Sequence, residues 1–151
     1  QRLPIKLMIE ITENQTLTIT PTIKELIRSL RNRGVLFALD DFGTGYANLC
    51  YLNELDLDVI KIDKTFIKAI KEVEQHIPML ESIIHLSGLL GLRMVAEGVE
   101  YGYQQQWLGK NKVDYLQGYQ FLPPVTFDDF MRYYKQTVNF FESASDSTFS
   151  T

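Results

Sequence analysis

The stretch FALDDFGTGYANL, residues 37–49, decides how this chain is expected to fold. It starts as an apolar, strand-like run, ends that run in the adjacent aspartates Asp40 and Asp41, and then breaks into a loop with two glycines. A buried strand is an unfavourable place for an ionised carboxylate, because the charge loses its hydration. Two adjacent aspartates at the end of such a strand therefore point to a site that uses them.

Strand-like and helical patterns alternate on both sides of this stretch. Apolar runs typical of buried strands occupy residues 5–12, 35–40, 59–63, 92–97 and 113–118. Helical patterns occupy residues 23–34, 48–55, 64–73, 77–91, 103–111 and 126–141, the last opened by Thr126 as an N-cap. Such alternation predicts βαβ units and a parallel sheet, hence an α/β fold. We expect one portion of a domain over residues 1–142 and a polar, disordered tail over residues 143–151.

Polar side chains end every predicted strand: Glu10, Asp40 with Asp41, Lys61 with Asp63, Glu97, and Gln117. In a TIM-like (β/α) barrel the carboxyl ends of all strands face one mouth, where active sites form. In such a barrel the five predicted strands would form about five βα units. Clustered carboxylates need cations to neutralise them, and carboxylate and amide oxygens suit Mg²⁺ or Mn²⁺. Two ions roughly 3.5–4 Å apart would clamp both oxygens of an in-line phosphoryl displacement.

Ordinary structural roles compete with this interpretation at each single position. A strand-end acid is most often an N-cap or a turn residue, and a glycine loop is most often only a turn. Lys61 is harder to explain in this way, because strand alternation places it opposite Ile60 and Ile62, in the barrel lumen, where an unpaired ammonium is unfavourable. The coincidence across five strands, rather than any one residue, supports a functional site.

Composition excludes several classes of protein. The formal net charge of −4 argues against binding to a DNA or RNA polymer, which normally requires a basic surface. No run approaches the ~20 apolar residues of a membrane span, so we expect no membrane contact from this piece and a cytoplasmic location. Cys50 is the only cysteine, which leaves no disulfide and no cysteine-based zinc site.

Five motifs carry a resemblance to a known family. MIEITE, ALDDFGTGYANLCYL, VIKIDKTFI, MVAEGVE and DYLQGYQF resemble successive motifs of the EAL-domain family, the bacterial cyclic-di-GMP phosphodiesterases, from about residue 5 to residue 124. The resemblance implies a TIM-like barrel that hydrolyses cyclic di-GMP to linear pGpG with two divalent ions, Mg²⁺ or Mn²⁺.

The resemblance also implies a role for each matching residue. The implied metal ligands are Glu10, Asp40, Asp41 and Glu97. The implied catalytic residues are Lys61, Asp41, Glu97 and Gln117. The implied supporting residues are Glu13, Asp63 and Glu100, together with Gly43, Thr44 and Gly45 of the glycine loop.

The Glu-Ala-Leu motif itself does not occur in these residues. We therefore expect the chain to be the C-terminal part of the domain, inactive in isolation, from a phosphodiesterase that forms a homodimer. An upstream sensory or diguanylate-cyclase-type domain is expected in the parent protein, which upstream segments could anchor to a membrane. Two alternatives stay open. One is a non-catalytic EAL module that binds cyclic di-GMP or a protein partner, and the other is an unrelated metal-dependent TIM-barrel hydrolase.

Overall fold

The computed structural model describes residues 6–12, 19–43, 52 and 54–146, with side chains as far as residue 137. The chain divides into two compact units, Gln1–Phe121 and Leu122–Thr151. The expected single portion over residues 1–142 stays a prediction. None of the described helices is both long and apolar enough to cross a membrane.

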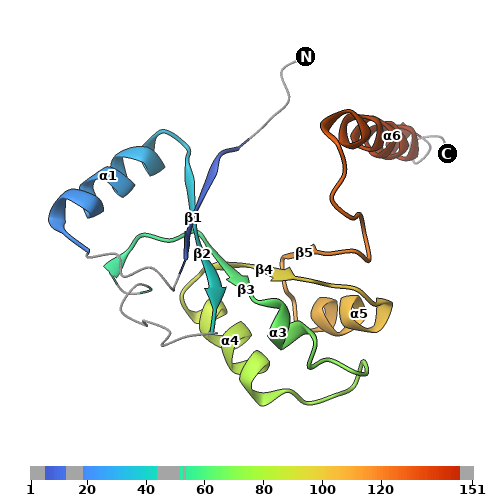
Figure 1. Cartoon of the computed structure of the whole chain (residues 1–151), viewed down its shortest axis with the longest axis horizontal. Coiled ribbons are helices and arrows are strands. Elements are labelled where there is room, and N and C mark those ends of the chain that lie inside the picture. Colours follow the sequence, from blue (N-terminus) through green and yellow to red (C-terminus); the bar gives the residue numbers. More distant parts are fainter. Residues whose placement is uncertain (1–5, 13–18, 44–51, 53, 147–151) are drawn as a thin grey trace. The chain divides into compact units, whose positions relative to one another are not determined.

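A parallel sheet of five strands forms the centre of the first unit (Figure 1). Its strands are β1 (Met8–Thr12), β2 (Leu36–Phe42), β3 (Val59–Ile62), β4 (Arg93–Glu97) and β5 (Tyr115–Gln117). Their order in the sheet is their order in the sequence. That is the winding of a (β/α) barrel, because a doubly wound sheet reverses its strand order partway. The α/β fold and the partial barrel of about five units are thus confirmed.

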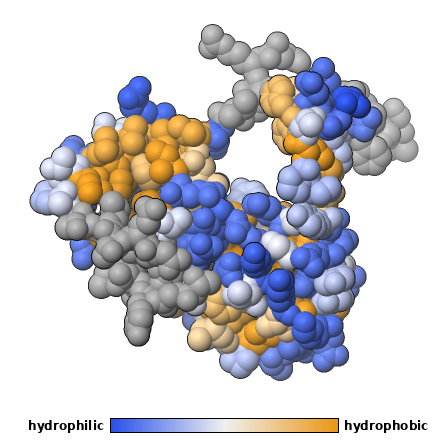
Figure 2. All heavy atoms as spheres, in the orientation of Figure 1, coloured by the Kyte–Doolittle hydropathy of each residue, from blue (hydrophilic) through white to orange (hydrophobic). Residues whose placement is uncertain are grey.

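Helices connect the strands. They are α1 (Pro21–Asn32), α3 (Lys64–Ile67), α4 (Pro78–Leu89) and α5 (Gly102–Lys110). The helix α1 contacts β2, while α3 and α4 contact β4. In Figure 1, α3, α4 and α5 lie along one side of the sheet. Apolar residues gather over the region of α1 and the adjoining strands in Figure 2.

Strand alternation separates the apolar core from the other face of the sheet. Phe37 and Leu39 of β2 and Ile60 and Ile62 of β3 are buried members of the core, together with Trp107 of α5. Because successive side chains of a strand point to opposite faces, the residues between them turn away from this core. Lys61, between the two isoleucines, is therefore placed on the lumen face, as predicted.

The expected helix over residues 64–73 is wrong beyond its first turn. The helix α3 ends at Ile67, and the N–H groups of Lys68, Ala69 and Ile70 close its last turn by donating to the carbonyls of Lys64, Phe66 and Ile67. The side chain of Gln75 accepts from the Lys71 N–H (2.7 Å) and donates to the Ala69 carbonyl (3.2 Å). This non-helical path lets Ile70 be fully buried. The expected helix 48–55 lies largely outside the described residues.

The second unit contains α6 (Phe127–Asp146), which is longer than the expected helix over residues 126–141. The predicted N-cap is confirmed, because the Asp129 N–H donates to Thr126 Oγ1 (3.3 Å). Asp128 and Asp129 lie in the first turn, where negative charge stabilises a helix. The helix continues through residues 143–146 of the expected tail, and residues 147–151 lie outside the described residues.

Candidate metal centre

A β-bulge presents the two adjacent aspartates. Strand β2 pairs with β3 through Leu39 and Ile60, and pairing resumes at Phe42 and Ile62. Two residues of β2, Asp40 and Asp41, thus stand opposite the single residue that separates the two isoleucines. The backbone of Asp41 is left-handed, with φ 55°, a conformation that aspartate tolerates better than most residues. Such a bulge re-aims side chains that would otherwise point to opposite faces of the sheet.

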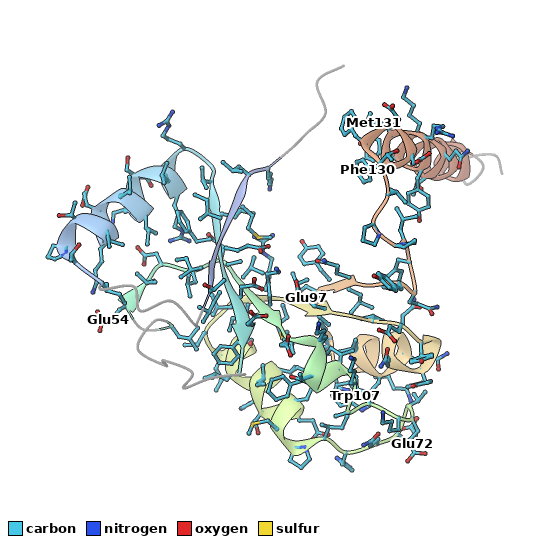
Figure 3. The ribbon with its side chains drawn as sticks, in the orientation of Figure 1. Glu54, Glu72, Glu97, Trp107, Phe130 and Met131 are labelled. Carbon is cyan, nitrogen blue, oxygen red and sulfur yellow. The ribbon has the colours of Figure 1, made fainter. Side chains whose placement is uncertain are left out.

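Asp40 and Asp41 meet a third carboxylate, that of Glu97 at the end of β4. One carboxylate oxygen from each of the three residues lies within 4.8 Å of the other two, and all three residues are half-buried. Figure 3 shows Glu97 among the side chains of the sheet, whereas Glu54 and Glu72 lie at the periphery. Strand ends that are distant in sequence therefore converge, as the barrel prediction requires.

The ammonium of Lys61 lies between carboxylates from three strands. Its Nζ is 2.7 Å from Glu97 Oε1, 2.9 Å from Asp40 Oδ1 and 2.9 Å from Glu10 Oε2. The lysine side chain is only 8% exposed. Burial lowers the pKa of Lys61, but the hydrogen bonds to Glu97, Glu10 and Asp40 outweigh it and hold the pKa above its ordinary value. The group is therefore a cation at neutral pH when no metal ion is bound.

The donor set fits a hard divalent cation. Asp40 Oδ1 is buried, and among the described contacts it meets only Lys61 Nζ at 2.9 Å, so a second lone pair of this oxygen is open to a ligand. Four carboxylates, those of Glu10, Asp40, Asp41 and Glu97, oppose one ammonium, a formal excess of three negative charges (4 − 1). Oxygen donors with excess negative charge suit Mg²⁺ and Mn²⁺.

Gln117 lies beside this cluster, because it is the register partner of Glu97 across β4 and β5. Gln117 is exposed at the edge of the sheet. The Gln117 carbonyl accepts from the Val99 N–H (3.0 Å), which ties the loop after β4 to β5. A β-carbon on Gly118 would lie 2.1 Å from the Val99 carbonyl oxygen, so only glycine fits this contact. Sequence reasoning missed this contact, although the glycine directly after Gln117 was a signal for it.

Two of the expected supporting acids have structural contacts. Asp63 caps α3, and its Oδ1 accepts from the Thr65 N–H (2.8 Å). Burial raises the pKa of Asp63, but the hydrogen bonds from Thr65 outweigh it and hold the pKa below its ordinary value. Glu100 is exposed, and its backbone N–H donates to Gln104 Oε1 (2.8 Å). No contact between these two residues and the acidic cluster is among the interactions described.

Gly43 follows the bulge with φ 93°, a left-handed conformation that favours glycine. A β-carbon at this position would lie 2.8 Å from the ring of Phe66. The expected supporting residues Glu13, Thr44 and Gly45 lie outside the described residues.

Comparison with known proteins identifies the family of this chain. The family model described as the EAL domain matches residues 1–124. The chain belongs to the EAL-domain family.

Relatives of this family include proteins with a named activity. The cyclic di-GMP phosphodiesterase PdeL of Escherichia coli is 41% identical over 129 residues, which cover 84% of this chain and 35% of PdeL. An EAL-domain protein of Listeria monocytogenes superposes with a TM-score of 0.74 and 35% identity, covering 85% of this chain and 51% of that one.

A solved complex of BlrP1 from Klebsiella pneumoniae with manganese and cyclic di-GMP is a further structural neighbour. It superposes with a TM-score of 0.62 and 31% identity, over 75% of this chain and 29% of BlrP1. The chain spans 25–35% of the length of three curated relatives from Escherichia coli.

Proposed function

We propose that the protein containing this chain hydrolyses cyclic di-GMP to linear pGpG with two divalent ions, Mg²⁺ or Mn²⁺. The observation that carries the proposal is the convergence of Asp40, Asp41 and Glu97 within 4.8 Å, beside the buried ammonium of Lys61, in an EAL-domain chain. Relatives named cyclic di-GMP phosphodiesterases and solved structures of similar EAL proteins with that nucleotide support it.

In this proposal the carboxylates of the cluster bind the divalent ions. Asp40 would hold the ions through its buried Oδ1, which contacts Lys61 Nζ with one lone pair and keeps a second for a cation. Asp41, Glu97 and Glu10 would complete the protein's share of the ligands. When bound, divalent ions supply Lewis acidity and make water more acidic.

The reaction would form one bond from the water oxygen to phosphorus and break one phosphoester bond, which opens the ring. The proton released by water passes to the departing ribose oxygen or to solvent. Lys61 would place a fixed positive charge beside the phosphate, where negative charge grows in the transition state. Gln117, as the neighbour of Glu97, would orient the water or the phosphate by hydrogen bonding.

Assembly and location remain predictions from the sequence. They comprise the homodimer, the upstream sensory or diguanylate-cyclase-type domain, the cytoplasmic location and the inactivity of the piece in isolation. The alternative of a non-catalytic module differs from the proposal in one observable, which is the absence of turnover despite nucleotide binding.

Hydrolysis of cyclic di-GMP by the full parent protein, with Mn²⁺ or Mg²⁺, tests the proposal. We compare the unmodified protein with Asp40→Asn and with the matched control Asp56→Asn, an exposed acid whose contacts are the ion pairs at 4.0 Å with Arg28 and Arg31. We expect pGpG from the unmodified protein and the control, and a loss of at least about 100-fold in Asp40→Asn. Binding of the nucleotide without turnover in the unmodified protein would instead establish the non-catalytic module.

A further inference from the structure

We infer that Asp58 is a positioning residue, which sets the register of the three strands that carry Asp40, Asp41, Lys61 and Glu97. Asp58 directly precedes β3 and lies at the opposite end of the strands from the cluster. Where the inference concerns metal affinity, it rests on the function proposed above. Its structural part stands on contacts between described residues alone.

Both backbone groups of Phe37 in β2 are held by Asp58. The Asp58 N–H donates to the Phe37 carbonyl (2.8 Å), and Asp58 Oδ2 accepts from the Phe37 N–H (2.9 Å). Main chain and side chain of one residue thus clamp one residue of the neighbouring strand. Phe37 is 3% exposed, so its N–H would be left without a partner in a buried position if the carboxylate were removed.

Asp58 also holds the strand on its other side. Its carbonyl accepts from the N–H of Arg93, the first residue of β4 (3.2 Å). A bidentate pair with Arg31 of α1 fixes the carboxylate itself, with Nη2 to Oδ1 at 2.7 Å and Nε to Oδ2 at 3.3 Å. One residue therefore joins β2, β3, β4 and α1.

The three joined strands carry Asp40, Lys61 and Glu97, while Glu10 of the cluster lies on β1. Asp40 follows Phe37 by three residues, Lys61 follows Asp58 by three, and Glu97 follows Arg93 by four. At a rise of about 3.3 Å per residue, the clamp lies roughly 10 Å from the cluster and acts on it through the strands. A slip of one residue between β2 and β3 would turn Lys61 toward the helices and an isoleucine into the lumen.

Asp114 provides an internal control, because it makes a similar contact elsewhere in the sheet. It directly precedes β5, and its Oδ2 accepts from the Met94 N–H of β4 (2.8 Å). That contact joins β4 to β5 and leaves the pairing of β2 with β3 untouched. Loss of the Asp114 carboxylate should therefore loosen the sheet without moving Asp40 relative to Lys61.

Two measurements on the chain of 151 residues test the inference with the variants Asp58→Asn, Asp58→Ala, Arg31→Gln and Asp114→Ala. The first is amide hydrogen exchange at Phe37 and Arg93, by NMR without metal. The second is Mn²⁺ affinity by calorimetry. Asp58→Asn keeps an oxygen acceptor for the Phe37 N–H but loses the charge. Arg31→Gln loses only the ion pair with Asp58. Asp58→Ala loses both the acceptor for Phe37 and the ion pair.

We expect Asp58→Asn and Arg31→Gln to keep the protection of Phe37 and to bind Mn²⁺ within about threefold of the unmodified chain. Asp58→Ala should lose that protection and weaken Mn²⁺ binding by roughly tenfold or more, a loss typical of removing support from metal ligands. Asp114→Ala should keep the protection of Phe37 and weaken Mn²⁺ binding by less than Asp58→Ala does. If Asp58→Ala does not fold, the rate of amide hydrogen exchange at Phe37 in Asp58→Asn tests the inference instead.

Unchanged Phe37 protection in a folded Asp58→Ala, or Phe37 exchange in Asp58→Asn as fast as in an unstructured chain, would overturn the inference. So would a folded Asp58→Ala that binds Mn²⁺ as tightly as the unmodified chain. If the unmodified chain binds no Mn²⁺, the metal site proposed for it fails, and the exchange data still decide the role of Asp58.

Discussion

Lys61 Nζ lies 2.7 Å from Glu97 Oε1, the shortest of its three contacts with carboxylates. The two residues come from neighbouring strands, and the contact places a cation at the centre of the acidic cluster. Lysine thus offsets part of the repulsion between acids that would otherwise oppose folding. A divalent ion that binds here competes with this ammonium for the same oxygens.

Lys61→Met should destabilise the metal-free chain, because it leaves Asp40 and Glu97 without their counter-ion. Removing one partner of a largely buried ion pair costs about 3–5 kcal/mol, and the partial exposure of the acids reduces our expectation to roughly 2–4 kcal/mol. Urea unfolding with a chelator measures the loss. Mn²⁺ should restore more stability to the variant than to the unmodified chain, and equal stability of the two without metal would contradict this.

Two substitutions of Asp41 should distinguish its role in the backbone of the bulge from its role as a metal ligand. Asp41→Asn and Asp41→Val both remove the carboxylate, but valine resists the left-handed backbone at φ 55°. We expect the valine variant to be less stable than the asparagine variant by about 1–2 kcal/mol, and both to bind Mn²⁺ more weakly. Urea unfolding and Mn²⁺ titration check this, and equal stability of the two variants would show that the bulge is not strained.

Gly43→Ala should destabilise the chain by roughly 1–3 kcal/mol, because its β-carbon would meet the Phe66 ring and its φ is left-handed. Gly88→Ala is the matched control. Gly88 lies within α4, and a β-carbon there meets nothing within 4 Å. The control should gain about 0.5–1 kcal/mol, since alanine favours a helix. Thermal or urea unfolding distinguishes the two, and a neutral Gly43→Ala would contradict the contact with Phe66.

Acid should weaken the clamp at Asp58. Burial raises the pKa of Asp58, but the hydrogen bonds from Arg31 and from the Phe37 N–H outweigh it, so the pKa lies below its ordinary value of 3.8. A group with a lowered folded pKa contributes its full stability above the unfolded value and loses it as the pH falls through the folded value. The difference in unfolding free energy between the unmodified chain and Asp58→Asn should therefore be constant above about pH 5 and shrink below pH 3.8. A difference that does not change with pH would exclude this role for the charge.

The fold and the clustering of the strand-end side chains followed from the sequence for a simple reason. Apolar strands alternate with helices, and their polar ends must meet at one edge of a parallel sheet. Lys61 was placed in the lumen by alternation alone, and the structure confirms it. The convergence of Asp40, Asp41 and Glu97 confirms the expected cluster, whereas its metal content stays a proposal.

Other features depend on tertiary contacts that no local pattern reveals. Strict alternation would send Asp40 and Asp41 to opposite faces, and only pairing with β3 shows the bulge. The path of the backbone after α3 includes hydrogen bonds with Gln75, which lies eight residues beyond the last helical residue. The clamp at Asp58 joins residues of β2 and β4 that are far apart in sequence, so its signal was only an acid before a strand.

Anomalous diffraction from crystals of the parent protein grown with Mn²⁺ is the most direct test of the metal centre. We expect a manganese peak bounded by the carboxylates of Asp40, Asp41 and Glu97, and its loss in Asp40→Asn crystals. Manganese bound only away from these three residues, in a protein that hydrolyses cyclic di-GMP, would contradict the proposed site.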